Sequence, residues 1–355
     1  MNTVDIAILV AKTLLFYLIV LHVVPIMVWV ERRGAALIQD RPGPNRVGPF
    51  GLLQPVADFV KFIFKEDPIP TGANRGLFLV APALILIPAS LTLAVLPFGD
   101  KVKLFGREIL LQVADLDIAI LYVLAIGSLG IYGILFGGWA SGNKFSLMGA
   151  LRASSQVISY EIPLGLAAVG AVAVYGTFSL REIALAQDGL WFGWLPRWGI
   201  FLQPVGFWLF FIASFAETNR LPFDLPETEA ELVAGYHTEY GSMKFGMFMM
   251  AEYMNLTTIS GVMVTLFFGG WHLPFVADAM LLKWIGSQNL LGLVQVVIFL
   301  TKVAIFLCVF VWVRWTVPRF RFDQLMRITW GRLIPLGIVN LLVTAGVMLW
   351  LGGWK

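Results

Sequence analysis

The sequence predicts an all-α polytopic integral membrane protein with about eight transmembrane helices and one amphipathic helix at the membrane interface. The composition, a series of long apolar runs and an uneven distribution of Lys and Arg predict this fold class. Hydrophobic residues make up 59% of the 355 residues and charged residues only 13%, a balance far from that of a water-soluble globule. We therefore expect lipid to surround most of the chain.

Each apolar run is long enough to cross a bilayer, which takes about 20 helical residues. The runs must be helices, because hydrocarbon offers backbone polar groups no water partner. The predicted spans are residues 6–30, 77–98, 118–139, 157–178, 200–216, 245–271, 290–315 and 333–351. Residues 191–198 and 281–284 could lie along the interface, which leaves the count open by about one span. No repeat or linker divides residues 1–355, so we expect a single membrane domain.

Lys and Arg concentrate in the connections that follow the first, third, fifth and seventh predicted spans. Because these residues are retained on the cytoplasmic side, the distribution predicts that both termini lie outside. The predicted cytoplasmic loops of interest are residues 31–76, 217–244 and 316–332.

The first of these loops contains two distinct patterns. Pro42, Pro44 and Pro49 alternate with glycines, which predicts a rigid turn with Arg41 on its flank. Residues 52–67 then place apolar side chains at helical spacing and polar ones, including Asp58, on the other face. This pattern predicts an amphipathic helix in the interface. By periodicity alone, a plain membrane-surface anchor is the favoured interpretation.

The loop after the fifth span is strongly acidic. Asp224 followed by Pro226 and Glu227 resembles a capping box and predicts a short helix that Gly235 could end. Capping does not explain the other acids. They form either a solvated acidic face or a buried cluster with raised, coupled proton affinities. The loop holds six acids and one base between residues 217 and 239, namely Glu217, Asp224, Glu227, Glu229, Glu231, Glu239 and Arg220.

Two further carboxylates fall inside predicted spans. Glu161 and Glu252 each lie about 12 Å inside the cytoplasmic boundary, given the rise of a helix. Ionisable groups at such depth are costly and are functional candidates by default. With Glu217 they predict an acidic route from the loop into the membrane. A single hydrogen-bonded structural carboxyl in each helix is the alternative, and the chain alone presents no complete transmembrane proton path.

Redox centres have few possible ligands in this chain. One cysteine, Cys308, cannot hold an iron–sulfur cluster, and the three histidines fall at different levels of the predicted membrane. No dinucleotide-binding glycine pattern is present. We therefore expect no metal or flavin in this chain, and electrons carried by a partner.

Five ordered segments closely resemble the NADH dehydrogenase subunit 1 family. They are ERRGAALIQDRPGPNRVGPFGLLQPVADFVKFIFKED, LRASSQVISYEIPL, AETNRLPFDLPETEAELVAGYHTEY, MAEY and RWTVPRFRFDQLM. The resemblance implies a membrane-arm subunit of the proton-pumping NADH:quinone oxidoreductase, respiratory complex I, that forms the quinone-access chamber and couples quinone reduction to proton translocation. It implies quinone as substrate, other membrane-arm and peripheral-arm subunits as partners, and NADH, FMN and iron–sulfur clusters on those partners. The expected location is the bacterial inner membrane, with the mitochondrial inner membrane as an alternative.

The resemblance also assigns residues by matching motif. The expected quinone-chamber residues are Glu31, Arg32, Arg41, Asp58, Arg220 and Asp224. The expected proton-relay residues are Glu161, Glu217, Glu227, Glu229, Glu231, Glu239 and Glu252. In the last loop we expect Arg314, Arg319 and Arg321 to pair with the acidic loop or with a partner. The alternatives are a homologous subunit of a hydrogenase-type or ferredoxin-fed complex, a stand-alone ion-coupled transporter and a passive anchor.

Overall fold

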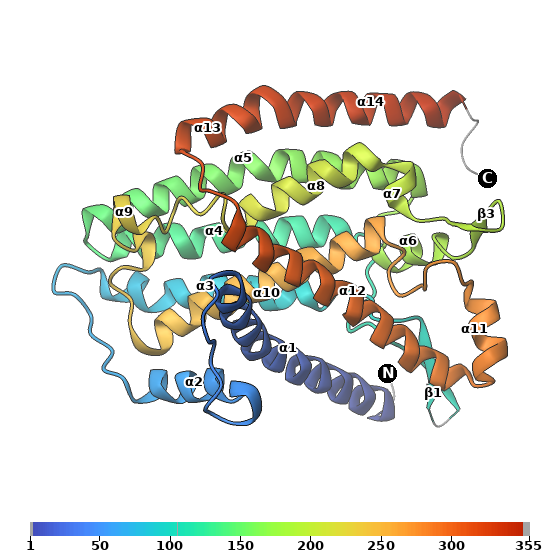
Figure 1. The fold of residues 1–355 in the computed structure, drawn as a ribbon, viewed down its shortest axis with the longest axis horizontal. Helices are drawn as coiled ribbons and strands as arrows, with labels where there is room; N and C mark the ends of the chain where they lie inside the picture. The colour runs from blue at the N-terminus through green and yellow to red at the C-terminus, as the bar shows by residue number, and fades with distance from the viewer. Residues whose placement is uncertain (1–2, 105, 351–355) are drawn as a thin grey trace.

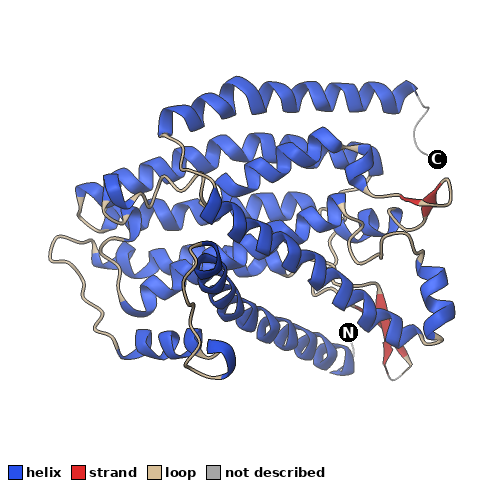
Figure 2. Cartoon of the chain, viewed as in Figure 1, coloured by secondary structure: helices blue, strands red, loops and turns tan. Residues whose placement is uncertain are grey.

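Helices dominate the structure, a computed structural model that describes residues 3–104 and 106–350 (Figures 1 and 2). The all-α membrane fold predicted from the sequence is confirmed. The long helices are α1 (Thr3–Ile38), α3 (Arg75–Leu93), α4 (Ala119–Ala140), α5 (Lys144–Tyr175), α8 (Pro204–Glu217), α10 (Ser242–Phe267), α12 (Gln288–Thr316) and α14 (Ile334–Trp350). The shorter helices are α2 (Gln54–Phe64), α6 (Leu180–Ala186), α7 (Gly199–Leu202), α9 (Glu229–Leu232), α11 (Asp278–Ile285) and α13 (Phe322–Ile328).

The remaining regular structure is small. Single turns of 3-10 helix form at η1 (Pro49–Gly51) and η2 (Gly235–His237), and a π-helical turn, η3 (Thr329–Leu333), joins α13 to α14. Two antiparallel hairpins pair β1 (Lys101–Leu104) with β2 (Arg107–Leu110), and β3 (Leu190–Trp191) with β4 (Leu195–Pro196).

By length and composition, six described helical segments could cross a membrane, so the count of eight is not confirmed. The other two predicted spans fall on α8 and α10. Helix α8 has only 14 residues because the chain leaves helical geometry at Gln203, just before Pro204. Helix α10 is long, at 26 residues, but Glu252 and Asn255 make it more polar. It lies within the bundle, where neighbouring helices rather than lipid surround much of it (Figure 1).

The long helices pack closely where small residues meet. A Cβ at Gly133 of α4 would come within 2.7 Å of the backbone nitrogen of Ile85 in α3. A Cβ at Gly138 would come within 2.5 Å of the carbonyl oxygen of Ser146 in α5. Close backbone approach at small residues is the usual way in which helices associate in lipid.

The molecule has two different ends. Helices α2 and α9 lie at one end, which we call the α9 end; α6, α11 and both hairpins lie at the other, the α11 end (Figures 1 and 2). Helix α1 starts and α14 finishes toward the α11 end (Figure 1). The predicted amphipathic helix is confirmed as α2, whose apolar residues Val56, Phe59 and Ile63 are exposed.

The prediction of a helix that starts at Asp224 is wrong. Thr228 precedes α9, which has only four residues, and Gly235 begins η2 rather than ending a helix. The loop folds back on itself here, since a Cβ at Gly235, where φ is +61°, would lie 1.6 Å from the Pro226 carbonyl oxygen. Tertiary contacts therefore override the local capping signal.

Candidate functional site

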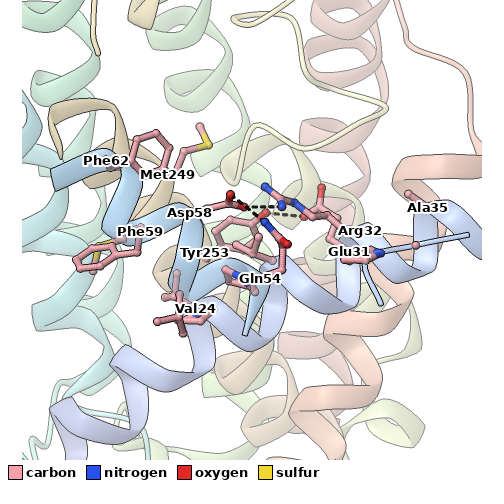
Figure 3. Close-up of a pocket in the computed structure, with 18 of the residues that line it drawn as sticks. Val24, Glu31, Arg32, Ala35, Gln54, Asp58, Phe59, Phe62, Met249 and Tyr253 are labelled. Atoms are coloured by element: carbon pink, nitrogen blue, oxygen red, sulfur yellow. Dashed lines mark hydrogen bonds and ion pairs between the residues drawn. The ribbon is translucent and has the colours of Figure 1, made fainter. Parts of the chain in front are cut away.

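A cavity of about 890 Å³ lies between α1, α2, α10 and the turn after α1 (Figure 3). Apolar side chains form most of its wall. All four residues predicted in the first loop line it: Glu31, Arg32, Arg41 and Asp58. The first-loop motif therefore predicted which of its residues gather around one space.

Helical spacing explains how these segments form one wall. Residues three or four apart share a face of a helix, and each of the three helices turns such a face to the cavity. From α1 these residues include Leu21, Val24, Val28, Glu31 and Ala35; from α2, Pro55, Asp58, Phe59 and Phe62; and from α10, Gly246, Met249, Met250 and Tyr253.

Polar groups of the cavity are concentrated around Glu31 and Asp58 (Figure 3). Arg32 Nη1 lies 2.5 Å from Asp58 Oδ2, and Gln54 Nε2 donates to Asp58 Oδ1 at 3.3 Å. The Tyr253 hydroxyl donates to Glu31 Oε2 at 2.8 Å. An apolar chamber with a few convergent polar groups is typical of a site for a largely hydrophobic small molecule.

Behind this wall lies a buried charge cluster, which we define as Glu31, Arg220, Glu252, Tyr253 and Arg314. Arg220 Nη1 lies 2.9 Å from Glu31 Oε2, and Arg220 Nε lies 2.7 Å from Glu252 Oε1. The Arg220 guanidinium also stands over the Tyr253 ring, 4.6 Å from its centroid, and Arg314 pairs with the other oxygen of Glu31. Two guanidinium groups thus compensate two carboxylates that are largely buried.

The acidic loop extends this cluster with two buried acids. Asp224 Oδ2 lies 2.9 Å from Arg319 Nη2, which confirms the expected pairing of the last loop with the acidic loop. Burial raises the pKa of Asp224 to about 6, although Arg319 opposes the shift. Burial, reinforced by the carboxylates of Glu252 and Asp224, raises the pKa of Glu227 well above its ordinary value.

His237 lies beside Glu227, with Nδ1 3.5 Å from Oε1. Burial lowers the pKa of His237 to about 4. Because the pKa of His237 is about 4, its ring is neutral near pH 7, so that this contact is not an ion pair.

The neutral state of His237 predicts a pH dependence of stability. Its pKa in the folded protein, about 4, is below the ordinary value of 6.5. The folded state therefore binds fewer protons than the unfolded state, and stability falls as pH decreases from 6.5 toward 4, by up to about 3 kcal/mol. Thermal denaturation in detergent across this range should show the loss, and His237→Gln should reduce it. His22→Gln, a change at an exposed ring of α1, is the control; equal pH dependence in both variants would contradict the assignment.

Two other acids of the loop, Glu231 and Glu239, lie nearer the surface. The side chain of Glu231 is 54% exposed and pairs with Arg152 at 2.5 Å. Glu239 accepts a hydrogen bond from Asn143 Nδ2 at 2.7 Å. The side chain of Glu229 lies outside the described part of the structure. The solvated-face interpretation thus describes Glu231, and the buried-cluster interpretation describes Asp224 and Glu227.

Glu161 and Glu217 face a separate small cavity of about 40 Å³, together with Asn255 and Thr258 of α10. A space of this size can hold one water molecule. Glu217 Oε2 is buried and has no hydrogen-bond partner among the described residues. Glu252 is not part of this group, so the carboxylates predicted as one route form two groups. Asn255 lies one turn beyond Glu252 on α10 and reaches the second group.

Comparison with known proteins identifies the family. The sequence model of the NADH dehydrogenase family matches residues 11–345. This chain belongs to the NADH dehydrogenase family. The resemblance inferred from five sequence segments is therefore confirmed over nearly the whole chain.

Individual members of the NADH dehydrogenase family align over most of their length. The NADH-quinone oxidoreductase H subunit 1 of Cytophaga hutchinsonii is 50% identical over 321 residues, which cover 90% of this chain and 91% of that protein. The NADH-quinone oxidoreductase H subunit of Bdellovibrio bacteriovorus is 46% identical over 365 residues, covering 95% of each chain. The corresponding H subunit of Thermomicrobium roseum is 50% identical over 335 residues, covering 94% of this chain and 93% of that protein.

The structure also gives the site contacts that the sequence did not predict. Tyr253 joins the charge cluster, and Asn255 and Thr258 line the small cavity. Arg314, expected to pair with the acidic loop or with a partner, pairs instead with Glu31 of α1. Tyr253 follows Glu252 directly, so the motif around Glu252 could have indicated it. Asn255 and Thr258 carried no distinguishing signal.

Proposed function

We propose that this chain is the membrane-arm H subunit of a proton-pumping NADH:quinone oxidoreductase, and that the cavity between α1, α2 and α10 receives the quinone. The names of the relatives support the first part. One observation carries the second: Glu31 and Tyr253 belong both to the cavity wall and to the buried charge cluster. A molecule in the cavity is therefore in contact with groups whose charge extends into the helix bundle.

The cavity suits the chemistry of a quinone. Its apolar walls match a hydrophobic tail, and the exposed apolar face of α2 gives the tail a path to lipid. The carbonyl oxygens of the headgroup accept hydrogen bonds, which the remaining N–H groups of Arg32 and Gln54 can donate. The headgroup would therefore lie beside Asp58 and Glu31.

Reduction of a quinone to a quinol takes up two electrons and two protons. We assign the electrons to iron–sulfur clusters, FMN and NADH on partner subunits, because one cysteine is too few for a cluster in this chain. The headgroup can gain negative charge or take a proton from groups near Glu31. Either event changes the charge balance among Arg220, Glu31 and Glu252. In a poorly hydrated site, such a change acts strongly on nearby acids.

The same change reaches the membrane interior along α10. Glu252 and Asn255 are one turn apart, and Asn255 opens onto the small cavity with Glu217 and Glu161. We propose that these two carboxylates pass the change on toward proton-translocating partner subunits in the membrane arm. In the proposed orientation the α9 end faces the cytoplasm, and both termini lie outside the bacterial inner membrane.

Gly246→Leu tests the cavity directly. Gly246 lines the cavity, and a Cβ there would find Phe62 Cδ2 at 3.9 Å, so a leucine extends into open space. We expect KM for a long-tailed quinone to rise about 10-fold in membranes that contain the complex, with oxidation of NADH by an artificial acceptor unchanged. Gly165→Leu is the matched control, because a Cβ at this glycine of α5 would have no atom of another described segment within 4 Å. Wild-type kinetics in the Gly246 variant would overturn the assignment of the cavity.

A further inference from the structure

At the α11 end, far from the quinone cavity, three segments bring together Asp188, His272 and Asp278. Asp188 follows α6, His272 follows α10, and Asp278 is the first residue of α11 (Figure 1). One potential ligand atom from each residue lies within 4.8 Å of the other two. The sequence predicted no metal in this chain, because its one cysteine and three dispersed histidines form no ligand cluster; Asp188 and His272 are 84 positions apart.

His272 is held in one orientation. The residue is only 2% exposed, and its Nε2 lies 3.0 Å from the carbonyl oxygen of Ala184. Because that carbonyl can only accept, Nε2 carries the proton and the lone pair of the neutral ring is on Nδ1. Fixing one ring nitrogen by a backbone carbonyl is also the usual way in which proteins orient a histidine that binds metal through the other nitrogen.

The free nitrogen of His272 faces both carboxylates. Nδ1 lies 3.0 Å from Asp278 Oδ1 and 3.7 Å from Asp188 Oδ1. Despite this proximity, neither Nδ1 nor Asp278 Oδ1 has a hydrogen-bond partner among the described residues. His272 Nδ1 and Asp278 Oδ1 are thus close but not aligned for a hydrogen bond. This arrangement is expected when both atoms are ligands of one metal ion.

The carboxylates are also held in place. Gln295 Nε2 donates to Asp278 Oδ2 at 2.7 Å, which leaves Oδ1 to face His272. The backbone nitrogen of Asp278 donates to Asp188 Oδ1 at 3.3 Å. Lys302 is close by, but its ammonium donates to the carbonyl oxygens of Phe268, Gly270 and His272, at 2.5 to 3.0 Å. The two carboxylates of Asp188 and Asp278 exceed the single positive charge of Lys302, so the site keeps a net negative charge.

We propose that Asp188, His272 and Asp278 form a binding site for a divalent cation of the zinc class. One imidazole nitrogen and two carboxylate oxygens are ligands that Zn²⁺ accepts, at about 2.0–2.2 Å each. Tetrahedral geometry at those distances separates ligand atoms by roughly 3.4 Å, between the 3.0 and 3.7 Å separations from Nδ1. Water would complete the coordination. The ion would tie the connections after α6 and α10 to the start of α11.

The test measures zinc in the intact protein. Wild-type protein, purified in detergent with its partner subunits, is equilibrated with micromolar buffered Zn²⁺, and zinc per chain is determined by plasma mass spectrometry. We expect Asp278→Asn and His272→Gln each to contain one zinc fewer than wild type. Asp188→Asn, at a side chain that is 39% exposed and thus least needed for folding, should lose the same zinc. Glu108→Gln, at an acid of the same end paired with Lys101, should retain it.

A second measurement separates lost binding from lost folding. Zinc that binds only the folded state raises the temperature of thermal denaturation by mass action. We expect micromolar Zn²⁺ to raise this temperature in wild type and in Glu108→Gln, but not in Asp188→Asn. Equal zinc content in wild type and all three ligand variants would overturn the proposal and would leave a protonated His272 as the bridge between the two carboxylates.

Discussion

Replacement of Arg220 by methionine is expected to abolish quinone reduction and to lower the amount of assembled complex. Arg220 is 3% exposed and contacts both Glu31 and Glu252. Its removal leaves a buried carboxylate without its cation, which typically costs about 3–5 kcal/mol. The content of the chain in membranes, measured by immunoblotting, and the NADH:quinone reductase rate would both report the loss.

Two further variants separate the loss of charge balance from the loss of a side chain. Arg220→Met combined with Glu252→Gln removes one buried cation and one buried anion, so we expect part of the chain content to return. Arg327→Met removes an exposed arginine of α13. It should leave the amount of the chain in membranes and the reductase activity unchanged. If Arg220→Met alone retained wild-type content and rate, the charge cluster would not have the role assigned to it.

Glu217→Gln and Glu161→Gln are expected to have the largest effect on proton pumping. Both residues face the small cavity, and Glu217 Oε2 has no hydrogen-bond partner among the described residues. Glutamine keeps the shape of the side chain but cannot take up a proton, so a relay through these carboxylates should slow about 100-fold. Acidification of inverted membrane vesicles during NADH oxidation with quinone measures this step.

The pattern of effects distinguishes a relay from general damage. Oxidation of NADH by an artificial acceptor should be unchanged in both variants, because we assign that reaction to partner subunits. Glu182→Gln, at an exposed glutamate near the α11 end, is the matched control and should pump normally. Wild-type acidification by both Glu217→Gln and Glu161→Gln would contradict the proposed relay.

Local patterns in the sequence were enough to predict several features. Apolar runs indicated the helices, and periodicity indicated α2 with Asp58 on its polar face. Of the six residues assigned to one chamber, Glu31, Arg32, Arg41 and Asp58 line one cavity, whereas Arg220 and Asp224 do not line it. The assignment of these four worked because α1, α2 and the turn between them, which carry these residues, are close in the chain, and both helices keep a regular face toward the cavity.

Features that depend on distant contacts could not be predicted from local patterns. Asp224 looked like a helix cap, and only the family resemblance indicated its pairing with the last loop, where Arg319 lies 95 residues further along the chain. Glu252 was grouped with Glu161 by depth, although Arg220 draws it into a different cluster. The break at Gln203 and the meeting of Asp188 with His272 also follow from packing between helices. Sequence spacing contains little information about such contacts.

Locating the bound quinone shows directly whether it occupies the cavity between α1, α2 and α10. A photoreactive quinone, activated by light in membranes that contain the complex, would be mapped by mass spectrometry of the labelled peptides. We expect labelling within residues 21–62 and 245–253, the segments that contribute to the cavity wall, and competition by excess unmodified quinone. Labelling confined to other segments or other subunits, with these residues unmodified, would contradict it.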